Sequence, residues 1–128
     1  MTGRRVSSGG PWEARYGYSR VAVAGDMAFV AGTTDAGPDG RSLHPRDPAG
    51  QARGVFEIIE RALAEAGFSL ADVVRTRMFV TDAANIAAIA TVHGEVFRDV
   101  RPASSAVVVA ALIDPTMLVE IEADARRA

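Results

Sequence analysis

Residues 105–112 read Ser-Ala-Val-Val-Val-Ala-Ala-Leu, and this stretch decides the fold. Its middle residues are apolar at consecutive positions, so a strand formed here offers apolar side chains to both faces of its sheet. Only two other stretches have helical spacing, and two helices cover one face of such a sheet. Something else must bury the second face, and the simplest candidate is another copy of the chain. The stretch therefore predicts a homo-oligomer.

The remaining sequence predicts one α+β (or α/β) domain over residues 1–128, in which a mixed sheet carries both helices on one face. Residues 1–15 have the composition of an N-terminal extension or loop. Apolar periodicity and turn residues delimit the other elements. Strands are expected at 21–24, 27–31, 73–80, 105–112 and 118–125, and helices at 48–66 and 86–97.

Turn and cap residues mark the element ends. Asp47 before Pro48 is typical of a helix N-cap, and Gly67 marks the end of that helix. Asn85 is expected to cap the second helix. The segment between Thr33 and Pro48 is a loop of about 15 residues, long enough to predict a role beyond connection.

The composition removes several kinds of chemistry. The 128 residues include no Cys, and all 14 basic residues are Arg, so the chain also lacks Lys. Disulfides, thiol nucleophiles, Cys-based zinc sites and lysine Schiff bases are therefore excluded. With only His44 and His93 as imidazoles, a three-histidine zinc site is excluded within one chain. We expect no metal and no cofactor, and His44, in a polar loop, is expected to be exposed.

Charge and hydropathy also limit the partners. The formal net charge is −2 and the sequence pI is about 5.6, which gives no electrostatic signal for nucleic acid. No stretch of about 18 apolar residues and no signal-peptide pattern is found. We therefore expect a cytoplasmic protein that binds neither nucleic acid nor membrane.

Several segments together resemble the Rid family, also called YjgF/YER057c/UK114. The similarity extends from about Tyr16 to Ala125 in a consistent order, although each motif alone is weak. The segments that carry it are Tyr18-Ser19-Arg20, Phe29-Val30-Ala31-Gly32, Val74 to Asp82, Arg101-Pro102-Ala103, Val109 to Leu112, and Leu118 to Ala123.

The resemblance implies a chorismate mutase-like fold and a homotrimer with small-molecule sites in the clefts between subunits. Its best-known members are deaminases that hydrolyse reactive enamines and imines without a metal. Tyr18 and Gly32 match site positions of the family, and Glu120 matches the glutamate thought to position the attacking water. Thr33 follows Gly32 and is expected to place a hydroxyl group near the ligand.

Departures from the family pattern are as informative as the matches. Ser104 occupies the position of the arginine that binds the substrate carboxylate in the active deaminases. Ala106, Ala31 and Ala90 replace a cysteine, a serine and an asparagine of the family site. A charge-assisted hydrogen bond is worth about 1.5–3 kcal/mol, so without it carboxylate binding weakens by at least one to two orders of magnitude. The chain thus resembles subgroups that lack this arginine.

Other residues could complete the site. Arg20, Arg77 and Arg101 are candidates for a replacement cation, or are solvated or bridge subunits. His93 lies on or beside the apolar stripe of its helix, where it either packs at a seam or acts as a general acid or base. Glu120 and Glu122 point to the same face of a strand, either as a site feature or in ion pairs.

Three hypotheses follow. The first is a metal-free hydrolase of a small imine, enamine or related C=N compound, not of the 2-aminoacrylate type, with Tyr18, Glu120 and His93 as catalytic residues. Ser104, Gly32, Thr33, Arg101 and Arg20 would then contact substrate. The second is a non-catalytic trimer that binds or senses a small metabolite, and the third is an interaction protein whose trimer surface serves a partner.

Overall fold

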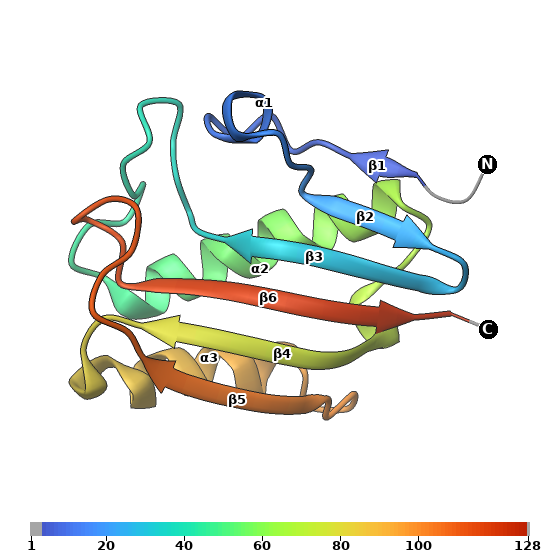
Figure 1. Cartoon of the computed structure of the whole chain (residues 1–128). Coiled ribbons are helices and arrows are strands. Elements are labelled where there is room, and N and C mark those ends of the chain that lie inside the picture. Colours follow the sequence, from blue (N-terminus) through green and yellow to red (C-terminus); the bar gives the residue numbers. More distant parts are fainter. Residues whose placement is uncertain (1–3, 128) are drawn as a thin grey trace.

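In the computed structural model, which describes residues 4–127, the strands form one mixed sheet (Figure 1). Its strand order is β1-β2-β3-β6-β4-β5. All neighbouring strands are antiparallel except β4 and β5, which are parallel. The strands are β1 (Arg5–Val6), β2 (Val21–Ala24), β3 (Met27–Thr33), β4 (Val73–Val80), β5 (Ala103–Val108) and β6 (Val119–Arg126).

Two long helices cover one face of this sheet (Figure 1), as the sequence predicted. They are α2 (Pro48–Glu65) and α3 (Ile86–Val96). Short 3-10 turns precede β4 and α3, at η1 (Leu70–Asp72) and η2 (Ala83–Asn85). The core lies between the helices and the sheet, and it includes the fully buried Val55, Ile59 and Leu63 of α2, Ile89 of α3, and Val80 and Ile121 of the sheet.

One of the two predicted N-caps is confirmed and the other is wrong. Asp47 accepts a hydrogen bond from the Gly50 backbone N–H at 2.9 Å, and Gly67 follows the end of α2 with φ of +86°. Asn85 makes no side-chain cap. The capping side chain is Asp82, which accepts from the Ala84 N–H at 2.9 Å, because η2 is inserted before α3.

The N-terminal segment is more ordered than its loop composition predicts. β1 pairs with β2, and a one-turn helix, α1 (Glu13–Tyr16), follows it. Both form through tertiary contacts, because buried Glu13 is ion-paired with buried Arg20 at 3.4 Å. Residues 1–3 of the expected extension lie outside the described residues.

The strand predicted at residues 105–112 is β5, and its bounds differ from the prediction. It begins at Ala103 and ends at Val108, where pairing with β4 stops and the chain turns into the loop around Asp114-Pro115. Since β5 is the last strand of the sheet, its side chains are exposed on both faces. Val107 is 48% exposed and Val108 is 53% exposed. In a single chain, this apolar edge is uncovered.

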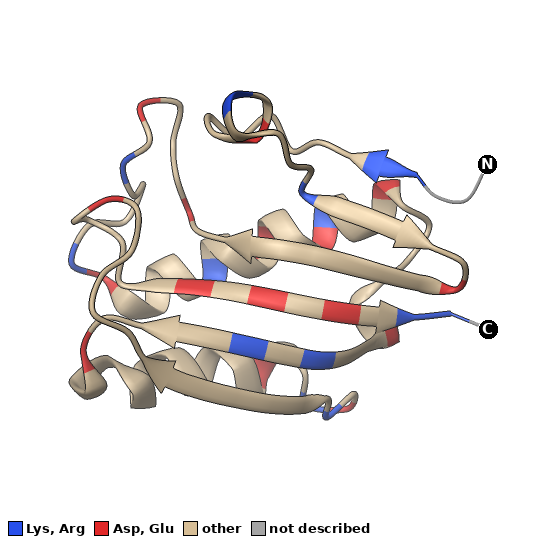
Figure 2. Ribbon diagram, in the orientation of Figure 1, with Lys and Arg blue, Asp and Glu red and all other residues tan. Residues whose placement is uncertain are grey.

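The sheet face opposite the helices combines apolar and charged side chains. Phe29 of β3 is exposed on it, and Phe79 of β4 lies beside Glu120 of β6. Acidic residues of β6 lie beside basic residues of β4 (Figure 2), with Asp124 opposite Arg75 and Glu122 opposite Arg77. No helix in the described part of the chain is long and apolar enough to cross a membrane.

Candidate functional site

A β-bulge places Gly32 against Glu120. Val30 pairs with Ala123 and Thr33 with Ile121, so β3 has one residue more than β6 between these pairs. A Cβ atom at position 32 would lie 2.8 Å from Cδ of Glu120. Any side chain at position 32 would therefore displace the Glu120 carboxyl group, and the glycine leaves room for it.

Among the acids of β6 on this face, Glu120 is the one whose negative charge is not compensated by an ion pair within residues 4–127. Burial raises its pKa, the Glu122 carboxylate raises it further, and the Arg20 guanidinium opposes these effects. Arg77 pairs with Glu122 at 3.5 Å and with Asp124 at 3.4 Å, whereas Glu120 has no ion-pair partner within residues 4–127. A carboxyl group with a raised pKa holds a proton more readily than an ordinary glutamate does.

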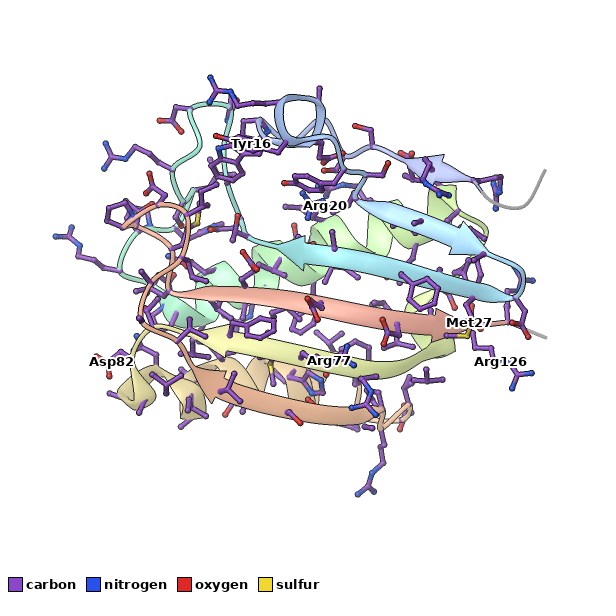
Figure 3. All side chains as sticks on the ribbon, viewed as in Figure 1. Tyr16, Arg20, Met27, Arg77, Asp82 and Arg126 are labelled. Carbon is purple, nitrogen blue, oxygen red and sulfur yellow. The ribbon has the colours of Figure 1, made fainter. Side chains whose placement is uncertain are left out.

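Arg20 is hydrogen-bonded to the bulge, and its guanidinium group is ion-paired as well. It is only 6% exposed. Its Nη1 donates to the Gly32 carbonyl at 2.7 Å and to Oγ1 of Thr33 at 3.0 Å, while Nη2 faces Glu13. In Figure 3, Arg20 lies between the N-terminal segment and β3. This guanidinium group therefore fixes the backbone next to Glu120, and Arg20 also lines a cavity of about 350 Å³ together with Trp12 and Thr33.

Tyr18 lies next to this group. Its ring is 5.6 Å from Cζ of Arg20, a cation–π arrangement that leaves the side chain partly exposed. The residue lines an open cavity of about 410 Å³ on the sheet face, together with Ser19, Phe29, Ala31 and Glu122. Tyr18 is thus accessible to a ligand that enters from this side.

His93 and Ser104 belong to a second group, on the helix side of the sheet. Oγ1 of Thr76 lies 2.8 Å from Nε2 of His93 and 2.7 Å from Oγ of Ser104. The imidazole ring packs against the rings of Phe56 and Phe97, with centroids 5.9 and 4.7 Å away. Burial lowers the pKa of His93, which favours the neutral form of the ring.

Within one chain, the two groups do not form a single pocket. Thr76 is buried beneath α3, whereas Glu120 points to the uncovered face. Two strands, β6 and β4, separate Gly32 on β3 from Ser104 on β5. At about 4.8 Å per strand, this separation is roughly 14 Å.

Two arginines and one histidine complete the account of the predicted residues. Arg101 is exposed in the turn before β5, with φ of +55°, and its side chain has no ion-pair partner within residues 4–127. Arg77 lies on the open face and is occupied by two acids. His44 is exposed, as predicted, although its Nδ1 lies 2.9 Å from Oδ2 of buried Asp35.

Two residues that hold these groups together were not predicted. Thr76 connects His93 to Ser104, and Glu13 pairs with Arg20. A threonine within an apolar strand gives no signal in the sequence, and Glu13 stands in a segment of loop composition. Among the described residues, no group of three or more His, Asp or Glu side chains is placed to hold a metal ion.

Comparisons with known proteins give a consistent result. The family model described as Endoribonuclease L-PSP matches residues 11–127. The crystal structure of Rv2704 from Mycobacterium tuberculosis, a member of the YjgF/YER057c/UK114 family, is 45% identical with a TM-score of 0.88, over 98% of this chain and 100% of that chain. The SCO2049 protein of Streptomyces coelicolor is 38% identical over 97% of this chain and 92% of its own. The structure of Escherichia coli TdcF with bound serine is 30% identical with a TM-score of 0.78, over 98% and 94% of the two chains.

Proposed function

The chain belongs to the YjgF/YER057c/UK114 (Rid) family, and within that family we propose that it is a metal-free hydrolase of a small imine, enamine or related C=N compound. The observation that carries the proposal is the Glu120 carboxyl group, which lies against the side-chain-free Gly32 with a raised pKa. A carboxyl group in this state can hold an attacking water and exchange protons with the reacting nitrogen.

The reaction needs only proton transfers and one water molecule. Water adds to the carbon of the C=N bond, and the π electron pair moves to nitrogen, which takes a proton. The carbinolamine then expels ammonia or an amine as the C–OH group loses its proton and becomes a carbonyl group. The attacking water gives up one proton and the departing nitrogen takes a second one. Glu120 protonates the nitrogen on addition and recovers its proton from the C–OH group, and Tyr18 orients the substrate.

A neutral substrate suits the site better than an amino-acid imine. Ser104 stands where the resemblance places an arginine, and its hydroxyl group gives a neutral contact. Arg20 cannot replace that arginine without leaving Gly32, Thr33 and Glu13, and Arg77 is paired with two acids. The carboxylates along β6 also oppose an anionic ligand (Figure 2).

We also propose that the site is completed between subunits of a homotrimer. Glu120 and Ser104 face opposite sides of the sheet, so one chain cannot present both to a small substrate. A neighbouring copy could present its Ser104 side to the Glu120 side of the first. Contact between copies would also cover the apolar residues Phe29 and Val107.

The first prediction concerns turnover. Ammonia release should be measured with neutral imines and with freshly generated 2-aminoacrylate. Glu120→Gln should lower kcat by at least about a hundredfold, the usual contribution of a general acid–base group. Asp124→Asn, on the same strand but paired with Arg77, should leave kcat within about threefold, since it does not contact the reacting atoms.

Ser104→Arg tests specificity in the same assay. It should increase turnover of the carboxylate-bearing substrate relative to neutral imines. If wild-type protein hydrolyses 2-aminoacrylate better than neutral imines, the substrate class is wrong. If Glu120→Gln has full activity, Glu120 has no catalytic role.

A second candidate function is small-ligand binding without turnover. It is favoured by TdcF, a relative whose structure holds serine. In this case, calorimetry would detect saturable binding of a small metabolite while every compound of the imine panel stays intact.

A further inference from the structure

Three side chains from three elements form a continuous chain of polar atoms. Nε2 of His93 on α3, Oγ1 of Thr76 on β4 and Oγ of Ser104 on β5 are joined by distances of 2.8 and 2.7 Å. These lengths are those of good hydrogen bonds involving a hydroxyl group. The chain connects a partly buried base to an exposed hydroxyl group, because Thr76 is 1% exposed and Ser104 is exposed.

Because the Thr76 hydroxyl group has only one proton, it can donate to only one of its two neighbours at a time, and this choice sets the direction of both hydrogen bonds. If Thr76 donates to Ser104, Nε2 of His93 must carry a proton and donate to Thr76. If Ser104 donates to Thr76, the Thr76 proton points at an unprotonated Nε2. Both orientations fit the two distances, and switching between them moves one proton from one end of the chain to the other.

Resting on the proposed function, we propose that Ser104, Thr76 and His93 form a proton relay, in which Thr76 is a positioning residue and Ser104 exchanges protons with the substrate. Ser104 would thus do more than replace a lost cation. The relay assigns a role to His93, which is separated from solvent-exposed Ser104 by the buried Thr76 hydroxyl group.

The proton transfers balance over one turnover. Glu120 first protonates the imine nitrogen as water adds to carbon. The proton lost by that water passes to Ser104 of the neighbouring copy, while Thr76 of that copy receives the Ser104 proton and Nε2 of its His93 receives the Thr76 proton. The imidazolium then returns a proton along the same chain to the departing amine. As the carbonyl group forms, its hydroxyl proton restores Glu120.

The surroundings of His93 favour a relay that accepts a proton first. Its ring contacts Phe56 of α2 and Phe97 beyond α3, and burial is the only cause that lowers its pKa. The ion pair that joins the two helices, Arg53 with Glu95, is more than half exposed on both sides. On the sheet side, the groups that face the ring are the uncharged hydroxyls of Thr76 and Ser104.

Nitrogen NMR of the imidazole rings tests the relay without any substrate. The chain has only two histidines, so a His44→Asn variant assigns the His93 signals. Ser104→Ala should shift the His93 Nε2 resonance although Ser104 does not contact the ring, and Thr76→Val should shift it further. Thr76→Ser, which keeps the hydroxyl group, should restore it. Ser105→Ala is the matched control, because its side chain points to the other face of β5.

Kinetics on the neutral imine test the proton transfer itself. Thr76→Val should lower kcat at least about tenfold with little change in KM, and should remove the limb of the pH profile that follows the titration of His93. Thr76→Ser should recover both. Urea unfolding of each variant separates this effect from a loss of folded protein.

The outcomes distinguish the relay from the proposed function. If Ser104→Ala leaves the His93 resonances the same as in Ser105→Ala, there is no coupled chain and the relay is overturned. Unchanged kcat in folded Thr76→Val also overturns it. If wild-type protein turns over no C=N compound but Ser104→Ala still shifts His93, the hydrolase assignment fails and the coupled chain stands.

Discussion

At the residue scale, the pair Gly32 and Glu120 shows how a missing side chain determines the chemistry of its neighbour. The bulge brings the two strands close enough that only glycine leaves space for the carboxyl group. The resulting burial raises the pKa of Glu120. The raised pKa of Glu120 therefore lowers the free energy of unfolding at neutral pH, because ionising a buried carboxyl group destabilises the folded state.

The sign of this effect gives a stability prediction. Below the ordinary pKa, near 4.5, Glu120 is protonated in both states and has no effect. As pH rises toward the higher folded-state pKa, only the unfolded chain loses the proton freely, so the free energy of unfolding falls. Glu120→Gln should therefore be more stable than wild type at pH 7, and this gain should disappear below pH 4.5.

Urea unfolding at pH 7 and pH 4 measures this difference. Asp124→Asn removes an acid that already pairs with Arg77, so it should show no such gain. Equal stability of Glu120→Gln and wild type at both pH values would mean that Glu120 is not a strained acid.

The sequence could predict residues whose role depends on residue type and could not predict those whose role depends on contact. Gly32, Glu120 and Tyr18 were identified through their segments, and the structure places Gly32 against Glu120 and Tyr18 against Arg20. That Arg20 contacts ligand stays a prediction, whereas its bonds to Glu13 and the bulge could be found only in the structure, because a buried guanidinium group needs several acceptors.

At the element scale, the helix ends give a matched pair of capping residues. Asp47→Ala should lower the free energy of unfolding by about 1 kcal/mol, because it removes the acceptor of the Gly50 N–H. Asn85→Ala should change it by less than about 0.5 kcal/mol, because Asn85 caps nothing. Chemical unfolding of both variants at one pH measures the contrast, and equal losses would mean that the Asp47 cap contributes nothing specific.

The elements that the sequence predicted are those with long apolar patterns. The strand predicted at residues 73–80 is β4 with the same bounds, and the helix that begins at Pro48 is α2. By contrast, β1 and α1 are two and four residues long. Such short elements carry no periodicity and form only because tertiary contacts, such as that of Glu13 with Arg20, hold them.

At the scale of the whole molecule, the uncovered sheet face gives a prediction about assembly. If copies of the chain cover it, Phe29→Asp should place a charge in the interface and lower the mass in sedimentation from three subunits to one. Circular dichroism should show that each subunit stays folded. Leu43→Asp, at an exposed apolar position on the loop after β3, is the control and should keep the trimer mass. A single-subunit mass for wild-type protein would contradict the trimer and the shared site.

The uncovered apolar edge could be predicted from the sequence, but the arrangement of the site could not. The apolar run at residues 105–112 predicted an uncovered face, and exposed Val107 and Val108 agree with it. Which face each polar side chain joins depends on the register between strands. The separation of Glu120 from Ser104 could therefore be found only from the pairing of β3, β6, β4 and β5.

The position of β5 at the edge of the sheet affects how readily the monomer aggregates. Ala103–Val108 contains no charged residue and no proline, the features that usually protect a free strand edge from pairing with other chains (Figure 2). Until something covers it, each folded monomer carries a segment that is prone to aggregation. We therefore expect refolding yields to fall as chain concentration rises.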